Sequence, residues 1–553
     1  MGSPKAARSS VKPGIWRRRV GAPLAALLVV LAVVVFSGKL GKGPNASSQF
    51  TNTLQPLRDK PDSAGIGGSP YKEDLATGTS DQELDAGNPG VALLALVSTN
   101  KLPKAPIWQW AREGQRQRCR HKRAKRAQQD QSLCRRNFPR MIWKEKRPLQ
   151  SQCSSILALY GSVPYTKCTP QNGTTICDLS NQRFDICELC GDARIIGQSS
   201  TVLYIPQPRA SNSEEWSIRA QSRKTLPWIK KVTVKSLNAS KPEPRCTSRH
   251  GMPAIVFSLG GFTGNVWHDF SDVLVPLFLT ARQFDRDVQL LITNNQPWFI
   301  KKYSAIFHHL TRHSVIDLDA DNKVRCYPHV IVGLRSHRDL GIDPKSSPQN
   351  YTLMDFRLFI REAYGLPAPK VAIPYRSDKD DPNKKPRIML IDRSKTRRFM
   401  NAPDVLSGLD WFGFEVVKAD LRVDSNLDEF VRIVDSCDAI MGVHGAGLTN
   451  MVFLRSGAVL VHIVPYGIEF MADGLYGAAA RDMGLKHVKY SISPHESTLL
   501  EKYGWNHTVI KDPEAIRKSG WEKLGELYMS QQNIVLNITR FAPTLLKAIE
   551  FIM

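Results

Sequence analysis

The feature that most constrains the fold is a series of short, almost wholly aliphatic runs between residues 254 and 464. Segments with helical periodicity separate them. Strands that are apolar on both faces and alternate with helices are typical of buried parallel sheets, so the pattern predicts an α/β fold. The expected strands are Ala254–Ser258, Val288–Ile292, Val330–Gly333, Arg387–Ile391, Phe414–Val417, Ala439–Val443 and Ala458–Val464, and the expected helices lie near 271–285, 300–311, 351–363, 427–436 and 448–455.

A segment from Pro367 to Pro386 divides this series into two groups. It is rich in proline and charge and poor in periodic apolar residues. Such a composition indicates a linker, so we predict two Rossmann-like lobes over residues 151–375 and 376–553. Ligands of doubly wound sheets bind beyond the carboxyl ends of the strands, and we therefore expect the site where the two lobes face each other.

The N-terminal region predicts a membrane anchor. Residues 20–38 carry no charge and approach the ~20 residues that span a bilayer, and six basic residues precede them. The positive flank favours a cytoplasmic tail over residues 1–19, a transmembrane signal anchor over 20–38 and a largely disordered luminal stem over 39–150. A cleaved signal peptide is the alternative, but the residues after the apolar run do not resemble a cleavage site.

Cysteines and glycosylation sequons fit a luminal address. The chain has ten cysteines, most of them between Cys119 and Cys246, and disulfides are expected in an oxidising compartment. Zinc is the competing interpretation of Cys187-Glu-Leu-Cys190, but no second ligand pair at suitable spacing is evident. The sequons begin at Asn45, Asn172, Asn238, Asn350, Asn506 and Asn537.

The formal net charge of +25 would suit a nucleic-acid-binding protein. Much of the excess lies in the N-terminal flank and in a basic run from Arg112 to Arg147. Such a run is usually a solvated, flexible segment. The alternative is that it binds acidic polysaccharide or an anionic membrane. A luminal address excludes nucleic acid as a partner.

The turn after Ala439–Val443 is the strongest candidate for a phosphate site. It contains His444, Gly445 and Gly447, and a helix is expected to follow. A strand–glycine turn–helix unit exposes free backbone N–H groups and the positive end of a helix dipole. The alternative is that the glycines serve close packing alone.

The turn after Arg387–Ile391 carries a group of cations. Arg393 and Arg397, with Lys395 and Arg398 nearby, follow the expected strand where it should open towards the other lobe. Arginine offers a permanent charge and a planar fork for phosphate oxygens, which suits a diphosphate leaving group. A solvated basic loop is the alternative.

The turn after Ala254–Ser258 carries candidate general bases. Glycine, threonine and asparagine precede His268, Asp269 and Asp272. A reaction in which a hydroxyl group attacks needs one group to accept its proton, and a histidine beside a carboxylate can do this. The aspartates could instead cap the following helix.

A possible metal motif occurs at Asp317-Leu-Asp-Ala-Asp321. The D-x-D pattern holds manganese and diphosphate in single-lobed, metal-dependent sugar transferases. Acidic triplets after a strand more often form a turn, and a two-lobed protein can dispense with a metal. We therefore predict no metal site.

Taken together, these motifs resemble glycosyltransferase family 61, and especially its plant branch. The resemblance covers residues from about 150 to the C-terminus and rests on Cys177–Asp192, Gly264–Asp272, Arg393-x-x-x-Arg397-x-x-x-Asn401, Gly442–Asn450 and Gly457–Gly467. It implies a GT-B-like, inverting enzyme with a UDP-sugar donor and no other cofactor. It also implies donor binding by Arg393, Arg397, His444, Gly445, Gly447 and Asn450, with His268 and Asp272 as catalytic residues.

The resemblance further implies a type II protein of the Golgi membrane that transfers a pentose to xylan. The expected donor is UDP-arabinofuranose or UDP-xylose, and other wall-polysaccharide transferases are possible partners. The alternatives are an N-glycan β-1,2-xylosyltransferase and a non-catalytic scaffold of a xylan-synthesising complex. Two positions depart from the family pattern: Cys190 is an extra cysteine, and Trp267 is bulkier than the expected aromatic residue.

Overall fold

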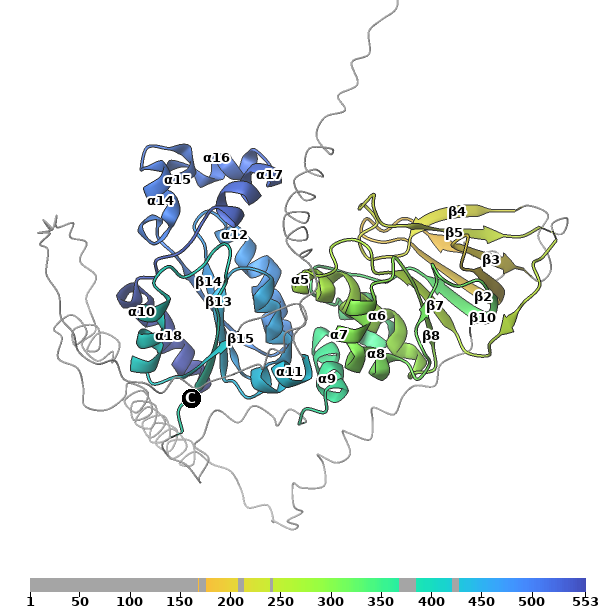
Figure 1. The fold of residues 1–553 in the computed structure, drawn as a ribbon, viewed down its shortest axis with the longest axis horizontal. Coiled ribbons are helices and arrows are strands. Elements are labelled where there is room, and N and C mark those ends of the chain that lie inside the picture. The colour runs from red at the N-terminus through yellow and green to blue at the C-terminus, as the bar shows by residue number, and fades with distance from the viewer. Residues whose placement is uncertain (1–167, 169–175, 207–212, 239–241, 368–383, 420–426) are drawn as a thin grey trace, which may run out of the picture.

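The computed structural model describes residues 168, 176–206, 213–238, 242–367, 384–419 and 427–553. The predicted tail, anchor and stem at 1–19, 20–38 and 39–150 lie outside these residues. No helix within the described part of the chain is both long and apolar enough for a membrane crossing. What the structure describes is a mixed α/β fold with two sheets, each flanked by helices (Figure 1).

The first sheet has ten strands, of which only one part follows the predicted parallel pattern. Strands β10, β7, β8 and β9 pair in parallel in that spatial order. Strand β10 lies beside β7 although β8 and β9 come between them in the chain, so the strand order reverses between β7 and β10. The bounds are β7 (Ala254–Ser258), β8 (Gln289–Thr293), β9 (Ile316–Asp317) and β10 (Val324–Val332).

The prediction of a Rossmann-like first lobe is wrong for the rest of this sheet. Strand β10 continues antiparallel into β2, and the order β4-β5-β3-β2 completes a mixed extension. Strand β5 alternates buried and less buried residues, which is typical of a sheet with one more exposed face. The added strands are β1 (Cys177–Asp178), β2 (Ile186–Ile196), β3 (Thr201–Ile205), β4 (Glu215–Arg219), β5 (Lys231–Ser236) and β6 (Ser248–Arg249).

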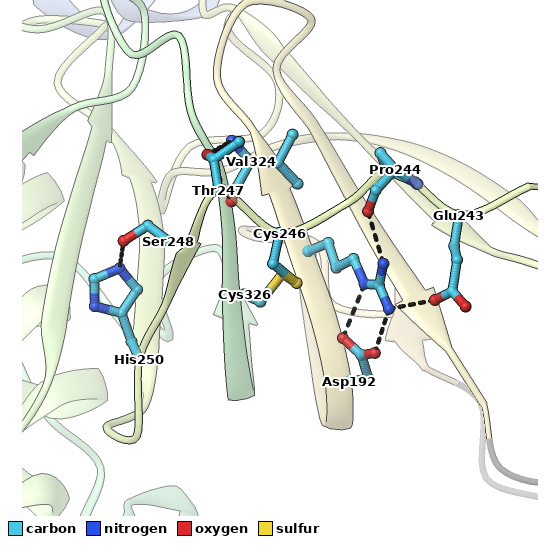
Figure 2. Close-up of a disulfide and its surroundings, with 10 residues drawn as sticks. Asp192, Glu243, Pro244, Cys246, Thr247, Ser248, His250, Val324 and Cys326 are labelled. Carbon is cyan, nitrogen blue, oxygen red and sulfur yellow. Dashed lines mark hydrogen bonds and ion pairs between the residues drawn. A yellow bond between two sulfur atoms is a disulfide. The ribbon is translucent and has the colours of Figure 1, made fainter.

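Disulfides fasten this extension to the parallel strands. Cys246, just before β6, is bonded to Cys326 in β10 (Figure 2). Beside it, Arg194 of β2 is almost fully buried and donates hydrogen bonds to the Asp192 carboxylate and to the Pro244 carbonyl oxygen, at 2.6 Å each. The disulfide, the hydrogen bond to Pro244 and the ion pair of Arg194 with Glu243 therefore hold the segment before β6 against β2 and β10.

The Cys187-x-x-Cys190 segment is also part of the disulfide network. Cys187 is bonded to Cys177, and Cys190 is bonded to Cys168. These bonds confirm the preference for disulfides over zinc at this segment. Cys190, the departure from the family pattern, thus has a partner within the chain.

Helices of the first lobe cover the parallel strands and reach the second lobe. The chain after β7 runs without interruption through α5 (Val266–His268), the π-helix η2 (Asp269–Leu274), α6 (Val275–Ala281) and η3 (Arg282–Phe284). The remaining helices are α7 (Pro297–Lys302), α8 (Ser304–Leu310), η4 (Pro344–Ser346), η5 (Pro348–Asn350) and α9 (Leu353–Ala363).

The second sheet is fully parallel, as predicted. Its order is β12-β11-β13-β14-β15, so the chain places β12 on one side of β11 and β13 on the other. The strands are β11 (Arg387–Ile391), β12 (Glu415–Ala419), β13 (Ala439–Val443), β14 (Val459–Val464) and β15 (Lys486–Ser491). Such a reversal of order is where ligands of open α/β sheets bind.

The helices of the second lobe include a long C-terminal helix, α18 (Ile538–Ile552), which packs against β14 and β15. Between the strands lie α10 (Ala402–Trp411), α11 (Leu427–Asp435), the 3₁₀-helix η6 (Ala446–Phe453), α12 (Glu469–Ala472), the π-helix η7 (Asp473–Gly477) and α13 (Ala478–Asp482). After β15 come η8 (Pro494–Glu496), α14 (Thr498–Tyr503), α15 (Thr508–Lys511), α16 (Pro513–Lys518), α17 (Trp521–Leu524) and η9 (Gly525–Ser530).

The two lobes share one hydrophobic core. Phe270 of η2 packs edge-to-face against both Phe356 of α9 and Phe453 of η6. Arg357, fully buried in α9, donates hydrogen bonds to the carbonyl oxygens of Leu454 and Met483 in the second lobe. Helix α9 of the first lobe therefore contributes apolar side chains to the shared core. It also supplies the hydrogen-bond donor for two backbone carbonyl oxygens of the second lobe.

Replacing Arg357 with alanine should destabilise the protein by about 3 kcal/mol, because two buried carbonyl oxygens lose their donor. We expect thermal unfolding to shift down by several degrees. The matched control is Arg312→Ala, which removes an exposed arginine paired with Asp287 and should leave the melting temperature within about a degree. Equal melting temperatures for the two variants would contradict the role given to Arg357.

Candidate active site

The cationic turn after β11 and the glycine turn after β13 meet at the reversal of strand order in the second sheet. Strands β11 and β13 are parallel neighbours, with Ile391 paired to Gly442, so both turns leave the same edge. The Arg397 Nη1 group donates a 2.8 Å hydrogen bond to the carbonyl oxygen of His444. The structure therefore brings together two groups that lie about fifty residues apart in sequence.

Arg393 and Arg397 form a concentration of positive charge without an acidic partner. Among the described residues, no carboxylate pairs with either guanidinium, and Arg397 has a buried Nε without a hydrogen-bond partner. Burial, together with the charge of Arg393, lowers the pKa of Arg397 to about 9. Two adjacent, unneutralised cations in a desolvated position are suited to bind an anion.

Gly445 allows both arginines to approach the backbone. Its φ is +147°, and a Cβ there would lie 2.5 Å from the Arg393 Nη1 and 3.2 Å from the Arg397 Nη1. The 3₁₀-helix η6 begins at the next residue, so its first N–H groups point towards the same turn. Guanidinium groups and a helix N-terminus thus converge on one place, as a diphosphate requires.

The family resemblance implies a UDP-sugar donor, and on that expectation Gly445→Ala should weaken UDP binding by roughly ten- to hundredfold, because the new methyl group displaces Arg393 and strains the backbone. Isothermal titration calorimetry with UDP measures the effect. Gly474→Ala is the matched control, since a Cβ at Gly474 meets nothing within 4 Å. UDP affinity equal to that of wild type in the Gly445 variant would remove this turn from the proposed site.

The other two predicted donor residues brace the turn. The Asn450 side chain is buried and donates a 2.8 Å hydrogen bond to the carbonyl oxygen of Gly447. This bond holds the first turn of η6 closed. The geometry therefore favours a positioning role for Asn450, while Gly447 lies at the exposed N-terminal end of the helix.

A histidine–aspartate pair occupies the start of the helix after β7. His268 Nδ1 lies 2.6 Å from Asp272 Oδ2, one helical turn along, and the Arg223 Nε donates to the same oxygen at 2.7 Å. Asp272 is buried, whereas the His268 side chain is 21% exposed. Asp272 thus faces the protein interior, and the imidazole is the member of the pair that solvent reaches.

The environment of Asp272 assigns the two roles. Burial raises its pKa, but the hydrogen bonds and positive charges of His268 and Arg223 outweigh burial and leave the pKa below the ordinary value. An ionised Asp272 fixes the proton of His268 on Nδ1 and leaves Nε2 free to accept one, as in other aspartate–histidine pairs. Arg223 lies on the first lobe's extension, and sequence reasoning missed it because it is 49 residues from Asp272.

Asp269, the third candidate base, has a structural role. Its carboxylate accepts hydrogen bonds from the Gly264 N–H at 2.7 Å and from the Tyr303 hydroxyl at 2.8 Å. Asn265, rather than an aspartate, caps the helix. Asp269 is completely buried and therefore holds the glycine turn against α7.

The two halves of the site adjoin each other at the lobe interface. Helix α5, which ends at His268, packs against η6, which begins after Gly445. The potential base and the glycine turn therefore belong to elements in direct contact. This arrangement agrees with the expectation that the site lies where the lobes face each other.

The acidic D-x-D residues are engaged in other interactions. The Asp319 carboxylate pairs with Lys230, and the Asp321 carboxylate receives two hydrogen bonds from Arg325. Asp317 accepts a hydrogen bond from Asn295. Within the described residues, one group has the spacing of metal ligands, Cys168, Cys190 and His329, and its two cysteines are joined in a disulfide.

The comparisons with known proteins match the part of the chain that carries His268, Arg393, Arg397 and His444. The family profile described as Glycosyltransferase 61 matches residues 266–461, from α5 through β14. Beta-1,2-xylosyltransferase XYXT1 of Oryza sativa subsp. japonica is 39% identical over 396 residues, which cover 68% of this chain and 84% of its own. The chain belongs to glycosyltransferase family 61.

Two further relatives are named for other activities than XYXT1. Alpha-1,3-arabinosyltransferase XAT2 of Oryza sativa subsp. japonica is 39% identical over 392 residues, covering 70% of this chain and 66% of its own length. Xylan glycosyltransferase MUCI21 of Arabidopsis thaliana is 30% identical over 408 residues, covering 70% and 81%. The arabinosyltransferase and the xylosyltransferase are thus equally identical to this family 61 chain, at 39%.

Proposed function

We propose that the protein is an inverting, GT-B-like glycosyltransferase that moves arabinofuranose or xylose from a UDP-sugar to the xylan backbone or its substituents. The observation that carries the proposal is a pair of arginines, Arg397 buried and Arg393 half-buried, that have no acidic partner among the described residues and lie beside the N-terminus of η6, which packs against the helix that carries His268. The named activities of the rice and Arabidopsis relatives supply the sugar and acceptor classes.

In this proposal, the second lobe stabilises the leaving UDP. Negative charge grows on the β-phosphate as the bond to the sugar breaks, and Arg393, Arg397 and the first N–H groups of η6 are positioned to receive it. Because these groups are fixed before the reaction, little reorganisation opposes the transition state.

The first lobe supplies the base. His268 Nε2 accepts the proton of the acceptor hydroxyl while that oxygen attacks the anomeric carbon from the face opposite UDP. Asp272 remains ionised and stabilises the imidazolium that forms. One bond to oxygen forms, one breaks, and the proton resides on His268 until solvent removes it.

We also propose that transfer needs no metal or other cofactor, because two arginines provide the charge that a cation would otherwise provide. The protein is expected to act as a type II protein of the Golgi membrane, with the catalytic lobes in the lumen. Association with other wall-polysaccharide transferases is part of this proposal.

Product analysis tests the function. The purified luminal region is incubated with UDP-arabinofuranose, UDP-xylose and UDP-glucose, each with xylo-oligosaccharides or with an N-glycan acceptor. We expect a pentose on xylo-oligosaccharide with inverted anomeric configuration. Transfer only to the N-glycan would favour the alternative xylosyltransferase, and failure to bind or hydrolyse any UDP-pentose would favour the scaffold.

A further inference from the structure

Three histidines from neighbouring strands form a line across the second sheet. His444 follows β13, His462 lies in β14 and His487 lies in β15. Gly442 pairs with His462, and Leu460 pairs with His487. Because side chains alternate along a strand with a period of two, all three imidazoles lie on the same face of the sheet.

The imidazoles are joined end to end. His444 Nδ1 lies 3.0 Å from His462 Nε2, and His462 Nδ1 lies 3.2 Å from His487 Nε2. His487 Nδ1 lies 3.6 Å from Asp473 Oδ1, whose side chain is 54% exposed. The three rings are almost completely buried, so the line connects the glycine turn of the proposed donor site with the protein surface.

The π-helix η7, which covers this face of the sheet, packs closely against the three histidines. The Tyr476 ring of η7 stacks edge-on against both His444 and His462. Gly477 follows, and a Cβ there would lie 2.8 Å from the His487 Nδ1. A side chain at that position would push the helix away from the last imidazole of the line.

The inner end of the line cannot carry a positive charge. Burial and the charges of Arg397 and Arg393 lower the pKa of His444 to about 3, and burial holds the pKa of His462 well below its ordinary value. Each of these imidazoles is therefore neutral and carries one N–H.

The outer end is different because an acidic group faces it. Burial and the charges of Arg481 and Lys489 lower the pKa of His487, whereas Asp473 attracts a proton to it. Asp473 is itself ionised, since a hydrogen bond from Lys489 and the neighbouring positive charges lower its pKa. A cation on His487 would thus be paired with Asp473, while one on His444 would lie beside two arginines.

The direction of the hydrogen bonds along the three imidazoles decides whether Nε2 of His444 carries a proton. With Asp473 ionised, His487 directs its Nδ1–H outwards, and each inner imidazole directs its Nδ1–H to the next ring. The Nε2 of His444 is then bare, on an imidazole close enough to Arg393 and Arg397 for their charges to lower its pKa. Phosphate oxygens only accept hydrogen bonds, so a bare Nε2 beside them is unfavourable. Diphosphate binding therefore favours the reversed direction.

We propose that binding of a nucleotide diphosphate takes up one proton through the line His444–His462–His487 and stores its charge beside Asp473. This proposal rests on the proposed donor site. A proton from the buffer, delivered through water in the site, forms Nε2–H on His444, so that no hydroxide is left behind. His444 passes its Nδ1 proton to His462 Nε2, and His462 passes its own to His487 Nε2. His487 keeps its Nδ1–H and becomes an imidazolium paired with Asp473.

The test is calorimetry of UDP binding at pH 7.5 in two buffers of different ionisation enthalpy, which gives the protons taken up per UDP. We compare wild type with His487→Gln, whose amide nitrogen can replace the Nε2 hydrogen bond but cannot titrate. The matched control is His308→Gln, which removes an exposed histidine of α8. Wild type and the control should take up about one proton more than His487→Gln.

The pH dependence gives a second readout. A linked uptake of one proton weakens UDP binding by about tenfold for each pH unit of increase, relative to a variant without the linkage. Asp473→Asn changes an exposed side chain and should abolish the same proton uptake on UDP binding. This variant replaces His487→Gln in the test if His487→Gln does not fold. Equal proton numbers in all folded variants that bind UDP would overturn the relay alone. Absence of UDP binding by wild type would overturn the donor site and the relay together.

Discussion

Replacing Arg397 with alanine should lower kcat/KM for the UDP-pentose by at least about a thousandfold. Arg397 is buried, has no acidic partner among the described residues and reaches the backbone of the glycine turn. A fixed charge in a position shielded from water stabilises a developing anion far more than a solvated one. Arg397→Lys keeps the charge but loses the planar fork, so we expect partial activity.

The control for this prediction lies in the same turn. The Arg398 guanidinium is exposed and donates a hydrogen bond to the Met400 sulfur, so Arg398→Ala should reduce the rate less than threefold. Initial rates at varied donor concentration measure both variants. A rate for Arg397→Ala within tenfold of wild type would contradict the role of the arginine pair.

Replacing His268 with alanine should lower kcat by roughly a hundred- to ten-thousandfold while the affinity for UDP stays unchanged, because the base acts only on the acceptor proton. Asp272→Asn should produce a similar loss, since the amide no longer fixes the proton on Nδ1. Steady-state kinetics and UDP calorimetry separate the two effects. Added imidazole should restore part of the rate of His268→Ala and none of the rate of Arg397→Ala.

His308→Gln is again the matched control, with a rate expected to equal that of wild type. If His268→Ala keeps a normal kcat, the general base lies elsewhere. A parallel loss of UDP affinity in His268→Ala would instead give His268 a role in the donor site.

The sequence predicted β11, β13 and β14 of the second lobe well because these strands are almost wholly buried, whereas β15, which alternates exposed and buried residues, was not predicted. Strands β11 and β13 have the predicted bounds, Arg387–Ile391 and Ala439–Val443, and so does β7 of the first lobe, Ala254–Ser258. A strand that is apolar on both faces gives a clear signal, and the residues after each strand reach the same sheet edge. The residue pattern therefore predicted where each turn lies, and the family resemblance implied that the arginine turn and the glycine turn serve one donor site.

The first-lobe extension could not be predicted in this way. Its strands alternate buried and exposed residues, and β2 pairs with β10 across more than a hundred residues of chain. The histidine line was missed for a related reason. His462 and His487 follow no local period with His444, and only the registers of β13, β14 and β15 bring the three rings together.

The shared core has a consequence for the design of hybrid enzymes. Exchanging residues 387–553 between an arabinosyl- and a xylosyltransferase would seem to transplant the sugar choice as a module. In this protein, however, Phe270 and Arg357 of one half are fitted to Phe453 and Leu454 of the other. Chimeras should therefore inherit α9, η2 and η6 from a single parent, so that the junction falls within surface turns and leaves this packing intact.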